Sequence, residues 1–248
     1  METTEDVPVV KTVADQTYQH LRRDIVSGEL APGTKLRVEM LSKRYGVGMS
    51  PLREALVRLH GEALVLAEGQ RGFWVAMISL DELDDTIKTR MLVETEALAR
   101  SIELGDDAWE ERIRTTYAEL SAMEAILHGG DRSIISRWEK ANTQFHEALV
   151  SACASPWLIR MRNMLHYHSE RYRMISLANT RFDRDVHDEH EAIMDATLSR
   201  KALRACRLIE VHLQQTADSV REALIANHGS LSEAKPKKRR SRTRPDNG

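Results

Sequence analysis

The first apolar positions of the chain repeat at the spacing of an amphipathic helix. Between residues 13 and 27 they recur about every 3.6 residues, at Tyr18, Leu21, Ile25 and Val26. Gly28 ends this stretch, and Ala31-Pro32-Gly33 is typical of a turn. A second, shorter helix is predicted over residues 38–45, and its expected buried side chains are Met40, Leu41 and Tyr45.

A third helix follows Gly46 and carries an arginine near its start. Ser50 can cap the helix and Pro51 suits its first position, so we expect Arg53 in the first turn. The residues expected to face the core are Leu52, Ala55, Leu56 and Leu59. Ser50, Arg53 and Val57 are left on another side of the helix.

Two short runs of strand-forming residues come next, Leu64–Leu66 and Phe73–Val75. They are joined by Glu68-Gly69-Gln70-Arg71-Gly72, whose glycines allow a tight hairpin with Arg71 at its tip. Helices followed by such a basic hairpin are typical of a winged helix-turn-helix, a fold that reads DNA. The residues expected to contact DNA are Ser50, Arg53, Lys43, Arg44, Gln70, Arg71 and Gly72. Lys43 and Arg44 would also suit a solvated helix surface.

From Leu80 onward the apolar positions keep helical spacing and show no strand alternation. The first three predicted helices contain Leu83 to Ile102, Ile113 to Leu127 and Ile135 to Leu149, and three more run over residues 156–179, 183–199 and 200–227. Six amphipathic helices with short connections favour an antiparallel all-α bundle, so we expect a mostly α fold. The predicted division is a flexible arm over 1–12, the winged domain over 13–78, the bundle over 80–228, and a disordered basic tail over 229–248.

The composition of the chain agrees with a globular protein and argues against a membrane or secreted one. The 248 residues are 42% hydrophobic, yet no apolar run is long enough to span a bilayer, and residues 1–6 are acidic rather than signal-like. We therefore expect a cytoplasmic protein with no membrane partner. Cys153 and Cys206 lie on apolar helix faces, so reduced thiols are predicted rather than a disulfide framework.

Charge is distributed unevenly along the chain. Residues 235–248 contain seven lysines and arginines and one aspartate, so this tail carries +6, whereas the whole chain carries −2. The remaining residues therefore carry −8. Such a tail suggests either a non-specific attraction to DNA or a solubilising role.

Polar side chains on the inward faces of the bundle point to a metal site. Asn142 and His146 are four residues apart on the stripe that contains Trp138, so both are expected to face the interior. His190 and His212 lie on the apolar faces of the fifth and sixth bundle helices. Neutral imidazoles from three helices suit Zn²⁺, Ni²⁺ or Mn²⁺, and an open position could take a ligand carboxylate. The simpler alternative is that each histidine is a hydrogen-bonded core residue.

The N-terminal part resembles the DNA-binding domain of the GntR family of bacterial transcription regulators. The residues that carry the resemblance are Gly28, Pro32-Gly33, Leu36, Leu41, Tyr45-Gly46-Val47, Pro51 to Leu56, Leu59, Leu64-Val65 and Arg71-Gly72. Met49 stands where the family usually has an arginine, and Ala63 stands where it usually has glycine. Because Met49 cannot donate a hydrogen bond to guanine, the resemblance implies an operator that differs from the family's usual one.

Residues 80–225 resemble the FCD effector domain of the FadR branch of this family. Its pattern of Asp or Asn, three residues and His, followed by two further histidines, is matched by Asn142, His146, His190 and His212. The six predicted helices resemble the VanR-like subgroup. More narrowly, Lys35-Leu36-Arg37 and Arg171-Tyr172-Arg173 resemble the carbon-starvation regulators of glutarate and 4-aminobutyrate catabolism.

The pair Arg90 and Glu94, four residues apart, has two interpretations. The two side chains can form a salt bridge with each other. Alternatively, the resemblance to the Arg-x-x-x-Glu of FCD domains implies that Arg90 binds an effector carboxylate through both terminal nitrogens. Tyr172 and Arg173 are further candidates to bind the other end of an acid ligand.

The two resemblances imply a metabolite-responsive regulator and not an enzyme. The protein would bind an inverted-repeat operator as a homodimer, repress transcription, and leave DNA when a small carboxylate effector binds, with a divalent metal in the bundle. The alternative is a metal-dependent enzyme that acts on a small acid and carries an appended DNA-binding domain. The sequence has no nucleophile elbow, P-loop or His-Glu-x-x-His motif that would support this alternative.

Overall fold

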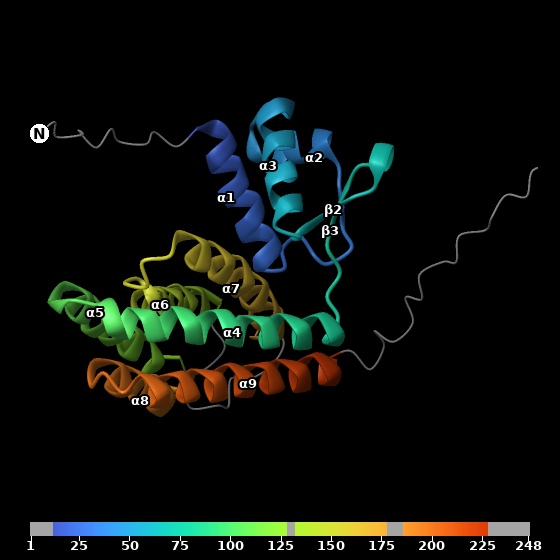
Figure 1. Cartoon of the computed structure of the whole chain (residues 1–248). Helices are drawn as coiled ribbons and strands as arrows, with labels where there is room; N and C mark the ends of the chain where they lie inside the picture. The colour runs from blue at the N-terminus through green and yellow to red at the C-terminus, as the bar shows by residue number, and fades with distance from the viewer. Residues whose placement is uncertain (1–11, 128–131, 178–185, 228–248) are drawn as a thin grey trace, which may run out of the picture.

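The structure is a computed structural model that describes residues 12–127, 132–177 and 186–227. As predicted, the described part is mostly helical, with a small N-terminal unit that lies on a larger helical bundle (Figure 1). Residues 1–11 of the predicted arm and the basic tail lie outside the described residues.

The N-terminal unit is a winged helix-turn-helix, as the sequence predicts. Its elements are α1 (Val13–Val26), β1 (Lys35–Leu36), α2 (Val38–Tyr45), α3 (Met49–Gly61), β2 (Val65–Ala67) and β3 (Phe73–Val75). The strands form an antiparallel sheet in the order β1-β3-β2. A single tight helical turn over Gly69–Arg71 connects β2 to β3 and forms the tip of the wing.

Apolar side chains from α1, α3 and the sheet form the core of this unit. The completely buried ones include Leu21, Ile25, Leu52, Leu56 and Val75. Burying each such side chain contributes roughly 1.5–3 kcal/mol. α1 begins at a capping box, in which the side chains of Thr12 and Asp15 each accept a hydrogen bond from the other residue's backbone nitrogen. Because α1 and α3 share this core, a movement of α1 also moves α3.

Two predictions about this unit are wrong. α3 begins at Met49, with Gly48 rather than Ser50 at the cap position and with no side-chain cap. Pro51 does not fix the start of the helix, because its missing N–H costs no hydrogen bond anywhere in the first turn. Met40 is 62% exposed rather than buried, since Val38 and Leu41 occupy the one face that this two-turn helix presents to the core.

The larger unit is an all-α bundle. In the part of the chain that is described, its helices are α4 (Leu80–Leu104), α5 (Asp107–Glu124), α6 (Arg132–Val150), α7 (Pro156–Leu177), α8 (His187–Leu198) and α9 (Ala202–Asn227). α4 lies against α7 and α9, α5 lies against α6, and α8 lies against α9 (Figure 1). This agrees with the six helices predicted from the apolar spacing.

The two units meet where α1 packs against α7 (Figure 1). On α7, His168 donates a hydrogen bond from Nε2 to the carbonyl oxygen of Glu62 at 2.7 Å, and Arg171 donates one to the carbonyl oxygen of Ala76. One helix of the bundle therefore holds the winged unit at two backbone positions. His168 is therefore a contact between the units.

Both cysteines lie in the described part of the chain. Both cysteines are free thiols, Cys153 buried and Cys206 half-buried. None of the helices in the described ranges is long and apolar enough to cross a membrane.

Candidate functional site

Three histidines from different helices meet inside the bundle. His146 comes from α6, His190 from α8 and His212 from α9, and all three are buried. One ligand nitrogen of each lies within 4.8 Å of the others, and the ring centroids are 4.7 to 5.3 Å apart. The rings point inward because each lies on an apolar helix face, as Ile193 beside His190 illustrates. The structure thus brings together histidines that are far apart in the sequence.

Two glutamates orient two of these rings. The Nδ1 of His190 lies 2.6 Å from Glu124 Oε1, and the Nδ1 of His212 lies 2.8 Å from Glu189 Oε2. A carboxylate accepts, so each Nδ1 carries the proton and Nε2 keeps its lone pair. Carboxylates placed in this way fix the orientation and tautomer of metal-binding imidazoles in many proteins. His187 also bonds to Glu124, through its own Nδ1 at 3.0 Å.

The nitrogens of this cluster fit a divalent metal ion. His190 Nε2 and His146 Nδ1 are buried and have no hydrogen-bond partner among the residues described, and such unpaired atoms are costly. Burial lowers the pKa of His146 well below its ordinary value, and nearby His212 and His190 lower it further, so the ring is neutral. Bonds of about 2.1 Å place two ligand nitrogens about 3 to 4 Å apart. Small ring movements would therefore bring the three histidines to one ion.

A cavity of about 20 Å³ lies beside the histidines, and we call it the histidine cavity. Asn142, Arg90 and Arg173 line it together with His146, His190 and His212. Its volume is sufficient for one water-sized occupant. A small organic acid is larger than this, so the lining side chains must move apart before such an acid can enter.

Two buried arginines, Arg90 and Arg173, line the histidine cavity, and a third, Arg162, shares a carboxylate with Arg90. Arg90 and Arg162 donate through Nε to Glu94 Oε1 at 3.0 and 3.1 Å, and Arg173 donates through Nε to Glu139 Oε2 at 3.1 Å. All five side chains are buried, and two further carboxylates, Glu124 and Glu189, hydrogen-bond to the histidines of the same cavity. Burial lowers the pKa of Arg90 to about 10, which still leaves it charged at neutral pH. A carboxylate that entered the cavity could therefore pair with the guanidinium groups of Arg90 and Arg173.

The two interpretations of Arg90 are therefore compatible. Its salt bridge to Glu94 exists, with Nη2 3.0 Å from Oε1, and the same arginine also lines the histidine cavity. Burial alone would raise the pKa of Glu94, but Arg162 and Arg90 outweigh it and hold this pKa below its usual value. Because Arg162 also pairs with Glu94, Arg90 can bind a second anion without leaving Glu94 unpaired.

Sequence reasoning missed Glu124, Arg162 and His166. His166 is completely buried, with Nδ1 3.0 Å from Arg90 Nη2 and Nε2 3.0 Å from Thr143 Oγ1. Burial and nearby Arg162 hold the pKa of His166 well below its ordinary value, so the neutral ring accepts from Arg90 and donates to Thr143. Arg162 and His166 are four residues apart on α7, and this spacing was the available signal.

The structure separates Tyr172 from Arg173. Arg173 lines the histidine cavity, whereas Tyr172 packs against Leu83 of α4 and Val220 of α9, and its hydroxyl lies 2.9 Å from Glu82 Oε2. Successive residues on a helix point about 100° apart, so the two side chains face different surroundings. Of this predicted pair, only Arg173 lies where an occupant of the cavity could reach it.

The residues expected to read DNA lie on an exposed side of the winged unit. Ser50 and Arg53 are exposed at the start of α3, and Lys43 is exposed on α2. Arg53 has no ion pair among the residues described, so its guanidinium can meet a base edge. Arg44 differs, because its Nη2 lies 2.7 Å from Asp24 Oδ2 and part of its charge is already matched.

The wing presents one exposed cation. Arg71 is 81% exposed by its side chain, and its nearest described acid is Glu68, 3.8 Å away. Gly72 has a φ of 107°, a conformation that favours glycine and lets the hairpin close. The side chain of Gln70 lies outside what the structure describes.

Comparison with known families and proteins gives matches over most of the chain. The model of bacterial regulatory proteins of the gntR family matches residues 13–75, and that of the FCD domain matches residues 85–215. The uncharacterized HTH-type transcriptional regulator BphR of Paraburkholderia xenovorans (strain LB400) is 40% identical over 218 residues, which is 87% of this chain and 89% of BphR. The HTH-type transcriptional repressor GlaR of Escherichia coli (strain K12) is 34% identical over 214 residues, which is 85% of this chain and 96% of GlaR.

Solved structures show the same fold. E. coli McbR/YncC superposes with a TM-score of 0.75 and 18% sequence identity, and the match covers 86% of this chain and 99% of that one. A regulator from Rhodococcus sp. RHA1, described as a putative transcriptional regulator GntR, superposes with a TM-score of 0.68 at 19% identity. The winged unit and the bundle therefore recur in proteins whose sequences differ widely from this one.

Proposed function

The chain belongs to the GntR family of bacterial transcription regulators and contains an FCD domain, and we propose that it represses transcription until a small carboxylate binds in the bundle beside a divalent metal. The family makes it a metabolite-responsive regulator with a DNA-binding and an effector-binding unit. The printed name of GlaR, a repressor, supports the sign of regulation.

One observation supports the effector proposal above all others. His146, His190 and His212 converge on a cavity that two cationic side chains, Arg90 and Arg173, also line. A metal would satisfy the unpaired nitrogens of His146 and His190. A carboxylate would accept charge-assisted hydrogen bonds from Arg90 and Arg173. The cavity therefore combines groups for a cation and groups for an anion.

Each residue has a separate role in this proposal. His146, His190 and His212 hold the ion, and the side-chain oxygen of Asn142 is a further ligand. A bound divalent ion supplies a positive centre for one carboxylate of the effector. Arg90 and Arg173 bind the acid through charge-assisted hydrogen bonds. Because the amide of Asn142 is neutral, the metal is held less tightly than it would be by an aspartate.

On DNA, we propose a homodimer whose two α3 helices enter successive major grooves of an inverted repeat. Arg53 donates to guanine, and Ser50 contacts a neighbouring base. Lys43 binds phosphate, whereas Arg44 reaches phosphate only by leaving Asp24. The wing residues Gln70, Arg71 and Gly72 complete the contact in the adjoining groove.

Metal analysis and a thermal-shift screen test the effector half of this proposal. Protein purified without chelators should contain stoichiometric divalent metal, and glutarate or succinate should raise its Tm. The same acids should act more weakly on chelator-treated protein. The matched control is 1,5-diaminopentane, which has the length of glutarate but no carboxylate and should have no effect. Metal-free protein that responds to none of these acids would contradict the proposal.

The same screen separates a sensor from the enzyme alternative. A sensor returns its effector chemically unchanged, so each acid that raises the Tm should be recovered intact after long incubation with metal-loaded protein. The names of the relatives, which are transcription regulators, support this expectation. Consumption of a bound acid would favour the enzyme instead.

A further inference from the structure

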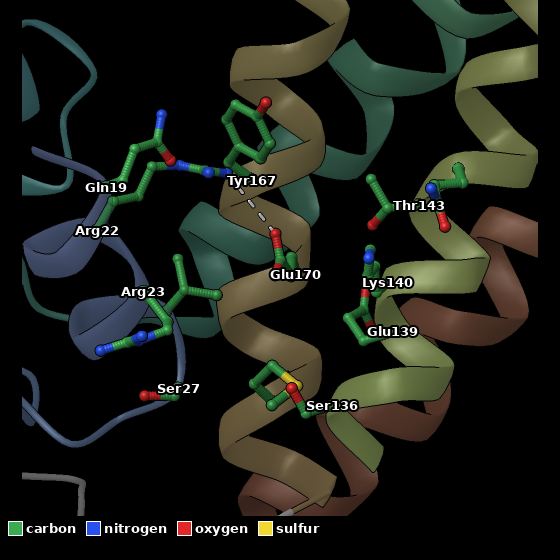
Figure 2. A pocket seen from close by; sticks show the side chains of 13 residues that line it. Gln19, Arg22, Arg23, Ser27, Ser136, Glu139, Lys140, Thr143, Tyr167 and Glu170 are labelled. Carbon is green, nitrogen blue, oxygen red and sulfur yellow. Dashed lines mark ion pairs between the residues drawn. The ribbon is translucent and has the colours of Figure 1, made fainter. Parts of the chain in front are cut away.

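One buried ion pair forms the wall between two cavities. On one side, Arg173 lines the histidine cavity. On the other side, its partner Glu139 lines a larger cavity of about 330 Å³ between α1, α6 and α7, which we call the joint cavity (Figure 2). Arg173 and Glu139 bond through two parallel contacts, Nε to Oε2 at 3.1 Å and Nη2 to Oε1. If Arg173 moves away in one cavity, the charge of Glu139 is therefore no longer offset in the other.

The joint cavity contains the charged contact between the two units. Arg22 on α1 lies 3.7 Å from Glu170 on α7, and its guanidinium stacks on Tyr167 with its carbon 3.2 Å from the ring centroid (Figure 2). Arg22 and Glu170 are both mostly buried. Each therefore depends on the other, because a buried charge without a partner is costly.

Glu139 acts on this contact through its charge. The pKa of Glu170 is raised to about 7, mainly by burial and to a smaller extent by repulsion from Glu139. Arg22 and Arg173 act in the opposite direction. While Arg173 offsets the charge of Glu139, Glu139 repels Glu170 least, and Glu170 holds Arg22 best. If Arg173 leaves, Glu139 is an unpaired carboxylate beside Glu170 and competes with it for Arg22.

We propose that the Arg173–Glu139 pair transmits the state of the histidine cavity to α1 by controlling the hold of Glu170 on Arg22. The link to an effector rests on the function proposed above, whereas the link between Arg173 and Arg22 is a property of the ligand-free protein. In this proposal, Arg173 and Glu139 are positioning residues that act on the winged unit through Glu170.

We call this coupling between Arg173 and Arg22 the relay. The small size of the histidine cavity explains how an acid would act on it. An acid does not fit into about 20 Å³ unless a lining side chain moves, and Arg173 is both a lining residue and a natural partner for a carboxylate. Binding of the acid therefore draws Arg173 from Glu139. Glu139 then draws Arg22 from Glu170, and α1 moves across α7. Because α1 and α3 share one core, α3 moves together with α1.

Hydrogen–deuterium exchange of α1 in the ligand-free, full-length protein tests the relay. Arg173→Met removes the cation from the wall and leaves Glu139 charged, so amide exchange in residues 13–26 should become about tenfold faster. Glu139→Gln removes the carboxylate instead and should leave exchange in α1 at the wild-type rate. The double variant R173M/E139Q should also return α1 to that rate. Exchange in α5, which packs against α6 and α8, is the internal control.

A difference in α1 exchange between R173M and E139Q distinguishes the relay from an ion pair that only stabilises the bundle. If the pair only stabilises the bundle, R173M and E139Q will speed exchange alike, in α5 as well as α1, and the relay is overturned. Unchanged α1 exchange in R173M also overturns it. If R173M does not fold, E139D, which draws the carboxylate away from Arg173 but keeps its charge, should speed α1 exchange where E139Q does not. None of these outcomes depends on metal or acid, so failure of the relay is distinct from failure of the effector site.

Discussion

At the scale of single residues, His146 offers the most direct test of the metal site, because its Nδ1 is buried without a partner in the described chain. His146→Ala removes one ligand while Glu124 and Glu189 still hold the other two rings. We expect bound metal to fall at least tenfold and the thermal shift by acids to disappear, with effector-free DNA affinity unchanged. Elemental analysis of equal protein amounts measures the loss. His20→Ala, exposed on α1, is the control, and full metal content in H146A would remove this residue from the site.

Arg53 and Lys43 should have different effects on DNA binding. Arg53→Ala is expected to cost about 1–3 kcal/mol at the operator and to relax preference at one base pair, because a bidentate contact to guanine is lost. Lys43→Ala should weaken binding to operator and random duplex equally, because phosphate contacts carry no sequence information. Fluorescence anisotropy on both duplexes separates the two effects. Equal losses for R53A on both duplexes would show that Arg53 contacts only the backbone.

The site residues differ in how far the sequence could place them. Asn142, His146, His190 and His212 lie on regular apolar stripes, so helical spacing was enough to direct all four inward, and they line one cavity. Glu124 could not be found in this way, because it acts only through the ring of His190 on α8, the third helix after α5 in the chain. Tyr172 was placed wrongly for a different reason, since its neighbour Arg173 faces the cavity while Tyr172 packs against α4 and α9.

At the scale of elements, the turn after α3 explains a departure from the family pattern. Ala63 has a φ of 58°, in the left-handed region where the family's usual glycine has no steric penalty. Ala63→Gly should therefore stabilise the protein, by about 0.5–1 kcal/mol after the added backbone entropy of glycine is subtracted. Urea unfolding measures the change. Ala118→Gly, exposed within α5, should instead cost about 1 kcal/mol, and a loss in A63G would show that Ala63 is not strained.

Most elements could be predicted because their apolar spacing is long and regular. All six bundle helices and the three helices of the winged unit occur where the sequence places them, and β2 starts only one residue later than predicted. The errors occur in short elements. The start of α3 depends on the backbone at Gly48, and the burial of Met40 depends on which single face of a two-turn helix meets the core.

At the scale of the whole molecule, the sequence predicts two units but not how they meet. Their contacts join residues that no local pattern relates, such as His168 with Glu62 and Arg22 with Tyr167. These contacts include hydrogen bonds and an ion pair, unlike the apolar cores of the two units. A polar joint with its own cavity can change its contacts at low cost, whereas a packed core resists such change. The joint is therefore the part of the molecule in which a signal between the units can be carried.

The charge balance of the whole molecule makes a prediction for residues 229–248. The chain without residues 235–248 carries −8 and repels DNA at long range, while those residues carry seven cations and one acid. Each cation that contacts phosphate adds about 0.9 to the slope of log affinity against log salt. Removing the tail should therefore lower affinity for random duplex and reduce this slope by several units, while the ratio of operator to random affinity stays constant. Anisotropy titrations at several salt concentrations measure both quantities.

A tail of equal length, with each lysine and arginine replaced by glutamine, is the matched control for that prediction. It should behave like the truncated protein, because the effect depends on charge and not on chain length. An unchanged slope in both variants would instead assign the tail a solubilising role. A lower slope in the truncated protein alone would show that the tail acts by its length. Recognition by Arg53 is local and attraction by the tail is long-range, so the two contributions should add in a double variant.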